Sequence, residues 1–314
     1  ASLDSPVADL AFHSFSNHKV QWTSEAIRLS THLDAAGKSE VQNAVSKAAN
    51  TPSPIEFFKI KTEEGVEMDG WMVKPENFNP SKKYPVVFFV YSEPAGANAI
   101  DRFGVGRNRL YAGDMRKDGY VYVTIDNRGT PAPKGREWRK SIYRKIGIVN
   151  IDDQAKAAKE VFKMGFIDTS RVAVWGWSGG GSATLNLMFR YPEIYKTGIS
   201  IAAVAFQLTY DNIYQERYMG LPQENREDFV KGSPITHAKN LRGNLLYIHG
   251  TGDDNVHYQN AELLQNELIK YNKQFQFMSY PNRSHSISEG EGTTRHLSTL
   301  YTNYLKQYCP PGGR

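Results

Sequence analysis

The chain has 314 residues, 40% of them hydrophobic, and a formal net charge of +5. A chain of this length can bury roughly three quarters of the surface it exposes when unfolded, which predicts one large domain with a small addition. No run of about five or more basic residues indicates a nucleic-acid partner, and no apolar run approaches the roughly 18 residues of a membrane span. The single cysteine, Cys309, excludes an intrachain disulfide and a cysteine-based metal site.

Residues 1–50 have a different pattern from the rest of the chain. Two short segments, 11–15 and 26–33, are predicted strands, and apolar residues alternate in the second with the period of two expected when one face is covered. Two strands are marginal on their own in water, so we expect them to belong to a sheet that continues outside this chain. A polar connector follows, and the Pro-rich segment 51–54 predicts a domain boundary.

From residue 56 onward, strand-like and helix-like segments alternate. The predicted strands are 56–61, 69–73, 85–91, 120–126, 172–175, 198–203, 245–249 and 275–280, of which the first two form an opening hairpin. The predicted helices are 150–164, 182–190, 258–271 and 293–308. This alternation predicts an α/β fold whose mainly parallel eight-stranded sheet is covered by helices on both faces, with the chemistry at the carboxyl ends of the strands.

Ser178 lies between a predicted buried strand and a predicted helix, in the sequence WGWSGGG at 175–181. This is the pattern of a nucleophile elbow, in which Gly176 and Gly180 remove side chains that would collide where the strand reverses into the helix. The exposed serine hydroxyl that results favours a hydrolase. The alternative is a glycine-rich turn with an incidental serine.

A serine hydroxyl becomes a good nucleophile only when a base removes its proton, and the base needs an acid to hold its tautomer. In a sheet of this type the chain order is serine, acid, histidine, each on a loop after a strand. The strand 245–249 leads to Asp253 and Asp254, and the strand 275–280 leads to His285. Spacing does not separate the two aspartates.

His249 and His257 are the alternatives to His285 as the base. His249 ends a core strand, where a structural role is commoner, and His257 stands too close to the candidate acid to approach it from a separate loop. Asp253 and Asp254 could instead bind a cation, although no further carboxylates cluster near them in the sequence.

Five segments carry a family resemblance: KKYP at 82–85, KMGFID at 163–168, WGWSGG at 175–180, YQERYMGLP at 214–222 and HGTGDDNVH at 249–257. Over about residues 55–308 the chain resembles the dipeptidyl peptidase IV branch of the prolyl oligopeptidase family. The resemblance implies an α/β-hydrolase domain of a serine peptidase that releases dipeptides from N-termini, typically after proline or alanine. It implies no metal and no organic cofactor.

By the same matching, the resemblance implies a catalytic triad of Ser178, Asp253 and His285, which decides between the two aspartates. It implies an oxyanion hole made by the backbone N–H of Gly179 and the phenol of Tyr91. Losing one such donor typically costs roughly 3 to 4 kcal/mol of transition-state stabilisation.

The resemblance also implies a small apolar pocket for proline, for which ordinary packing of the tyrosines is the alternative. Its walls are Val204, Tyr210, Tyr214 and Val256. Asn255 would bind a substrate carbonyl. The chain departs from the family at two positions: Gly179 stands where a tyrosine often follows the serine, which predicts an open side of the pocket, and Gln207 stands where a tryptophan often lines it.

The family's paired glutamates, which neutralise the amino terminus of the peptide substrate, lie in an upstream β-propeller for which this chain has no room. Residues 1–50 resemble only the last propeller strands and a linker, followed by the catalytic domain over 51–314. The resemblance therefore implies a propeller in the same, longer protein, favours a periplasmic or secreted location, and leaves a homodimer open. The alternatives in function are an esterase or acyl-peptide hydrolase on the same fold and a catalytically silent interaction module.

Overall fold

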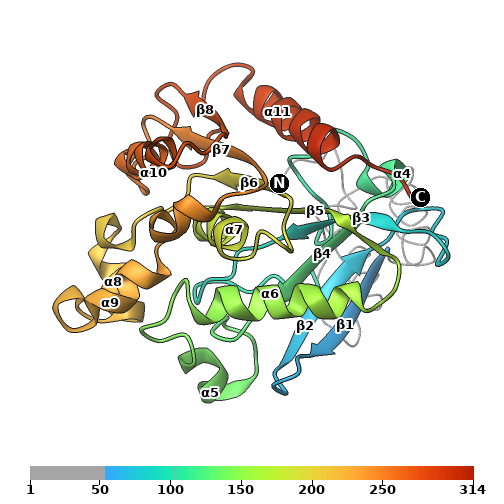
Figure 1. The fold of residues 1–314 in the computed structure, drawn as a ribbon, viewed down its shortest axis with the longest axis horizontal. Helices are drawn as coiled ribbons and strands as arrows, with labels where there is room; N and C mark the ends of the chain where they lie inside the picture. The colour runs from blue at the N-terminus through green and yellow to red at the C-terminus, as the bar shows by residue number, and fades with distance from the viewer. Residues whose placement is uncertain (1–53, 103) are drawn as a thin grey trace, which may run out of the picture. The chain divides into compact units, whose positions relative to one another are not determined.

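The computed structural model describes residues 54–102 and 104–314 (Figure 1). The chain divides into two compact units, one of Ala1–Glu56 with Ile100–Arg107 and one of Phe57–Ala99 with Asn108–Arg314. The segment 1–50, for which the sequence predicts terminal propeller strands, lies outside the described residues. The candidate site and the helices of the described residues belong to the second unit, as does the sheet apart from the first two residues of its first strand.

One eight-stranded sheet forms the centre of this unit, with the strand order β1-β2-β4-β3-β5-β6-β7-β8. Its strands are β1 (Ile55–Lys61), β2 (Glu67–Val73), β3 (Tyr84–Phe89), β4 (Val121–Asp126), β5 (Ile167–Trp177), β6 (Thr197–Ile201), β7 (Asn244–Gly250) and β8 (Gln276–Tyr280). β2 pairs with β4 in the antiparallel direction, and every pairing from β4 through to β8 is parallel. The predicted strands and the mainly parallel sheet are confirmed.

Four helices confirm the predicted helical segments: α6 (Val149–Phe162), α7 (Gly179–Arg190), α10 (Gln259–Lys270) and α11 (Thr293–Tyr308). The structure adds α4 (Met115–Asp118), α5 (Gly135–Lys140), α8 (Asn212–Met219) and α9 (Pro222–Gly232), together with the 3-10 helices Gln207–Thr209 and Pro234–Asn240. Each helix in the described part of the chain is too short or too polar to cross a bilayer.

Successive side chains of a strand point to opposite sides of the sheet. In the central strands both sets are apolar, so both faces of the sheet need to be covered. On one face, Phe88 of β3 packs edge-on against Tyr195, which follows α7. On the other face, the next residue of β3, Phe89, packs against Trp175 of β5, which in turn packs against Tyr301 of α11. The strands at the centre are therefore buried on both sides, which explains their continuous apolar sequences.

Candidate active site

Ser178 lies at a sharp turn where β5 ends and α7 begins, with φ 59° and ψ −120°. A positive φ is uncommon for a residue with a side chain and stores strain. The turn brings two backbones close together: a Cβ atom at Gly176 would lie 2.4 Å from the carbonyl oxygen of Val90, and one at Gly180 would lie 2.2 Å from it. The predicted role of both glycines is confirmed, because no side chain fits at either position.

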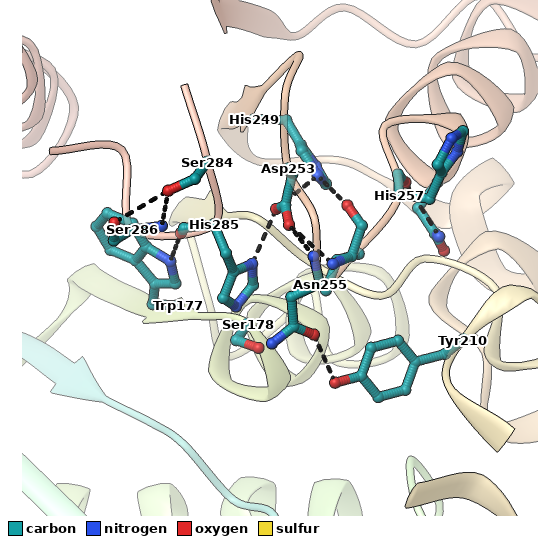
Figure 2. A network of polar contacts seen from close by, with 12 residues as sticks. Trp177, Ser178, Tyr210, His249, Asp253, Asn255, His257, Ser284, His285 and Ser286 are labelled. Atoms are coloured by element: carbon teal, nitrogen blue, oxygen red, sulfur yellow. Dashed lines mark hydrogen bonds and ion pairs between the residues drawn. The ribbon is translucent and has the colours of Figure 1, made fainter. Parts of the chain in front are cut away.

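Asp253 and His285 come together from the loops that follow β7 and β8. His285 Nδ1 lies 2.8 Å from Asp253 Oδ2, and Figure 2 shows the imidazole ring between this carboxylate and Ser178. Trp177 Nε1 donates to the carbonyl oxygen of His285 over 2.9 Å, which fastens the histidine loop to the end of β5. Among the hydrogen bonds of the described residues, none joins the Ser178 hydroxyl to His285. The structure thus brings an acid, an imidazole and a serine into one row.

The carboxylate of Asp253 is surrounded by donors. Its Oδ1 accepts the backbone N–H groups of Asn255 (2.9 Å) and Val256 (2.8 Å), and its Oδ2 lies 3.2 Å from His249 Nε2 in addition to the contact with His285. Burial alone would raise the pKa of Asp253, but the hydrogen bonds from His249, His285 and Asn255 outweigh it and hold this pKa well below its ordinary value. The group stays ionised.

The alternatives that the sequence left open occupy different environments. His249 is fully buried, and its Nε2 also lies 2.9 Å from the carbonyl oxygen of Val256, so it braces the loop that carries Asp253. His257 and Asp254 are exposed, and it is Asp253 that contacts His285. Within the described residues there is no group of three or more His, Cys, Asp or Glu side chains that could hold a metal ion.

A cleft of about 510 Å³, its open mouth included, lies beside Ser178. Five of the residues predicted to form the oxyanion hole and the pocket line it: Tyr91, Gly179, Val204, Tyr210 and Tyr214. Val256 is fully buried and is not among the lining residues. Asn255 does not line the cleft itself but contacts Tyr210, which does. The Tyr210 hydroxyl donates to Asn255 Oδ1 over 2.8 Å (Figure 2).

Two residues that line the cleft together with Ser178 carry candidate hydrogen-bond donors, Gly179 and Tyr91. Gly179 is the first residue of α7, so its N–H has no partner within the helix and lies at the positive end of the helix dipole. Burial, with a smaller contribution from Glu93, raises the pKa of Tyr91 to about 12. The phenol therefore keeps its proton at neutral pH and can donate a hydrogen bond.

Glu93 is a cleft residue that the sequence analysis missed. A Cβ atom at Gly179 would lie 2.2 Å from Glu93 Cγ, so this side chain fills the side of the pocket that was expected to be open, and that expectation is wrong. Glu93 is 6% exposed, and Tyr214 donates its hydroxyl to Oε2 over 2.7 Å. Burial raises the pKa of Glu93 to about 7, against the opposing effect of the Tyr214 hydrogen bond. Its position just after β3, at the sheet edge where sites form, was the available signal.

The sheet order and the serine turn followed by an acid and a histidine define an α/β-hydrolase. Residues 111–310 match the sequence model of the prolyl oligopeptidase family, and the chain belongs to this family of serine peptidases. The resemblance drawn from the sequence motifs is thereby confirmed.

Individual relatives cover most of this chain but only part of their own length. It is 36% identical over 256 residues to prolyl endopeptidase FAP of Mus musculus, which covers 81% of this chain and 33% of the relative. It is 34% identical over 239 residues to dipeptidyl peptidase 4 of Felis catus, with 75% and 31% covered. The crystal structure of Porphyromonas gingivalis dipeptidyl peptidase 4 matches with a TM-score of 0.76 and 36% identity, over 88% of this chain and 38% of that one. The chain thus spans about a third of the length of the curated relatives it matches.

Proposed function

We propose that this domain removes dipeptides from the N-termini of peptides through an acyl-enzyme, with Ser178 as nucleophile, His285 as base and Asp253 as the orienting acid. The observation that carries this proposal is the 2.8 Å contact between His285 and an ionised, fully hydrogen-bonded Asp253, in line with a serine held on a strained turn. Xaa-Pro and Xaa-Ala bonds are the substrates that the family resemblance implies.

Asp253 accepts the Nδ1–H of His285, which leaves Nε2 free to take the proton of the Ser178 hydroxyl as its oxygen attacks the substrate carbonyl. The protonated imidazole then gives this proton to the leaving amine, and the substrate's acyl group stays on Ser178 as an ester. The same histidine then takes a proton from water as it attacks the ester and gives it to the departing Ser178 oxygen, which releases the dipeptide and restores the serine hydroxyl. The bond between serine and histidine often tightens only when substrate binds, which accords with its absence among the described contacts.

Negative charge develops on the substrate carbonyl oxygen during each attack. The N–H of Gly179 and the phenol of Tyr91 are the donors we assign to it, since both line the cleft next to Ser178 and neither is ionised. Asn255 has its Oδ1 occupied by Tyr210, so its Nδ2 group, which points towards the side of Ser178 in Figure 2, is left to bind a substrate carbonyl. Val204, Tyr210 and Tyr214, which line the cleft, would enclose the side chain next to the scissile bond.

A free amino end is the second part of the proposal. The relatives that match include proteins named dipeptidyl peptidase 4 and proteins named prolyl endopeptidase FAP, so a similar catalytic domain accompanies both names. We propose that an upstream β-propeller of the same protein supplies the groups that recognise the amino terminus, as the family resemblance implies.

The test uses the full-length protein and its Ser178→Ala variant. We expect a fluorophosphonate probe to label Ser178, and kcat/KM for Ala-Pro and Ala-Ala arylamides to exceed that for their N-acetylated forms by orders of magnitude. Ser178→Ala should abolish labelling and turnover. Equal cleavage of acetylated peptides would indicate an endopeptidase, much faster turnover of small esters would indicate an esterase, and failure to label Ser178 would revive the silent interaction module.

A further inference from the structure

Three side chains that line the cleft beside Ser178 carry buried oxygen atoms that have no donor in the described part of the chain. Asn186 Oδ1, Gln207 Oε1 and Gln215 Oε1 are buried without a hydrogen-bond partner among the described residues, and all three side chains line this cleft. Buried polar atoms in proteins nearly always have a partner, so three such acceptors around one cleft point to a ligand that donates.

Neighbouring carbonyl groups fix two of these amides in their present orientation. Asn186 Nδ2 donates to the carbonyl oxygen of Gly232 over 2.9 Å, and Gln207 Nε2 donates to that of Ile146 over 3.0 Å. Turning either amide over would place its oxygen against a carbonyl oxygen, which is repulsive. Their free oxygen atoms are therefore acceptors by necessity.

Glu93 adds a fourth acceptor group to the same cleft, and three of the nearby hydroxyl groups already donate elsewhere. Tyr214 donates to Glu93, Tyr210 donates to Asn255, and Ser182 donates to the carbonyl oxygen of Ser178. Among the described residues, the Tyr91 phenol and the Gly179 N–H remain free to donate, but both are assigned to the substrate carbonyl oxygen. Proline or alanine alone would leave the buried acceptors unpaired.

We propose that this cleft also accepts a lysine side chain on the acyl side of the scissile bond, with its ammonium group donating to Glu93 and to the amide oxygens beyond the tyrosine walls. This inference rests on the proposed function and widens its substrate class beyond proline and alanine. An ammonium group brings three donors and no acceptor, which matches the lining. Burial raises the pKa of Glu93 to about 7, and a cation beside it would favour the carboxylate and gain a charge-assisted hydrogen bond.

The lining that makes this possible depends on small residues at the start of α7. Gly179 leaves room for Glu93, whose Cγ lies 2.2 Å from where a Cβ atom would be, and Ser182 and Ala183 line the cleft further along the helix. A larger residue at 179 would displace the carboxyl group. Glu93 and Gly179 therefore act together as a specificity-determining pair.

The experiment compares Ala-Lys, Ala-norleucine and Ala-Pro arylamides with the full-length protein at pH 8. Norleucine has the same four-carbon stem as lysine but no ammonium, so the ratio of their kcat/KM values isolates the charged group. We expect lysine to be favoured over norleucine by at least about tenfold. Glu93→Gln should lower this ratio severalfold, and Gln207→Leu should lower it in the same direction.

Glu216→Gln is the matched control, because Glu216 lies on α8 beside Gln215 but is exposed and outside the cleft. It should leave the ratio unchanged. Cleavage of Ala-Pro with a lysine-to-norleucine ratio near one would overturn the inference and leave the proposed function intact. Failure to cleave any of the three arylamides would overturn both the inference and the proposed function. An unchanged lysine-to-norleucine ratio in Glu93→Gln and Gln207→Leu would show that these groups do not bind the ammonium, which would also overturn the inference.

Discussion

Asp253 and Glu93 are two buried carboxylic acids near Ser178, each 6% exposed, that differ in their hydrogen bonds. Asp253 is contacted by four donors, from His285, His249 and the N–H groups of Asn255 and Val256. Among the described residues, the carboxyl of Glu93 has one such donor, the hydroxyl of Tyr214. The pKa falls for the first and rises to about 7 for the second. Burial raises the pKa of both carboxyls, but at Asp253 the hydrogen bonds outweigh it, whereas at Glu93 the single hydrogen bond from Tyr214 does not.

This difference in pKa fits the two carboxyl groups for different chemical roles. A carboxylate that stays ionised over the whole physiological range can hold an imidazole in one tautomer through every step of a reaction. A carboxyl group that gains or loses its proton near pH 7 can instead respond to the charge of whatever enters the cleft.

Replacing the well-hydrogen-bonded acid should have the largest effect. In Asp253→Asn, the amide can present its NH₂ group to His285 and so favour the tautomer that cannot accept the serine proton, and we expect kcat to fall by roughly 10⁴. The matched variant Asp254→Asn, at the exposed neighbouring position, should keep kcat within about twofold of wild type. Steady-state kinetics on Ala-Pro arylamide would check both, and equal losses would contradict the division of roles between the two aspartates.

The poorly hydrogen-bonded acid should make stability depend on pH in the opposite direction to Asp253. Because the folded-state pKa of Glu93 is raised from 4.5 to about 7, its stabilising protonated form is fully present below about pH 4.5 and is lost as the pH rises through 7. Relative to Glu93→Gln, the wild type should lose about 3 kcal/mol of unfolding free energy between pH 4 and pH 8. Denaturant unfolding at several pH values measures this.

Asp253 supplies the internal contrast for that experiment. Its folded-state pKa is lowered, so its contribution is present above the ordinary value of 3.8 and is lost only as the pH falls further. The wild type should therefore gain stability relative to Asp253→Asn as the pH rises from about 2 to 5. Parallel pH profiles for the two variants would show that the contrast between the two acids is wrong.

The contact between Gly179 and Glu93 allows a direct test by double mutation. Gly179→Ala places a methyl group 2.2 Å from Glu93 Cγ, and overpacking of this kind costs roughly 1–3 kcal/mol, which we expect to appear as about a 10- to 100-fold loss in kcat/KM. Glu93→Ala in the same chain makes room for the methyl group and should recover much of this loss. Purely additive effects of the two substitutions would mean that the side chains do not compete for this space.

The smallest expected effect concerns the hydrogen bond between Tyr214 and Glu93. Tyr214→Phe removes the donor that lowers the pKa of Glu93, so the loss of stability should move to higher pH by up to about one unit. Tyr143→Phe, at a position 50% exposed, is the control and should leave the profile unchanged. A shift to lower pH in Tyr214→Phe would be inconsistent with this hydrogen bond.

The fold could be predicted from the sequence because its strands are continuous apolar runs buried on both faces, as at 172–175 in β5. The helices α8 and α9 escaped prediction. In α8, Ile213 is 82% exposed, and the helix begins because the side chain of Asp211 accepts the N–H groups of Ile213 and Tyr214. A helix stabilised by its cap has little apolar periodicity to detect.

The row of serine, acid and histidine was predictable because chain order and strand ends constrain it, as with Ser178 and His285. The choice of Asp253 over Asp254 by chemistry alone was not, since it depends on which carboxylate turns inward to meet His249 and His285. Glu93 was out of reach for the same reason. Its burial arises from a glycine in a distant part of the chain, and single-sequence patterns carry no information on such pairs.

The backbone conformation of Ser178 lowers the stability of the protein at the residue that catalysis requires. Its φ of 59° is costly for serine by roughly 1–3 kcal/mol but easy for glycine. This relief exceeds the roughly 0.5–1 kcal/mol that glycine costs through the entropy of the unfolded chain, so an inert Ser178→Gly protein should melt at a higher temperature than the working enzyme. Such a protein would be a heat-tolerant trap for intact peptides, useful for capturing the natural substrate.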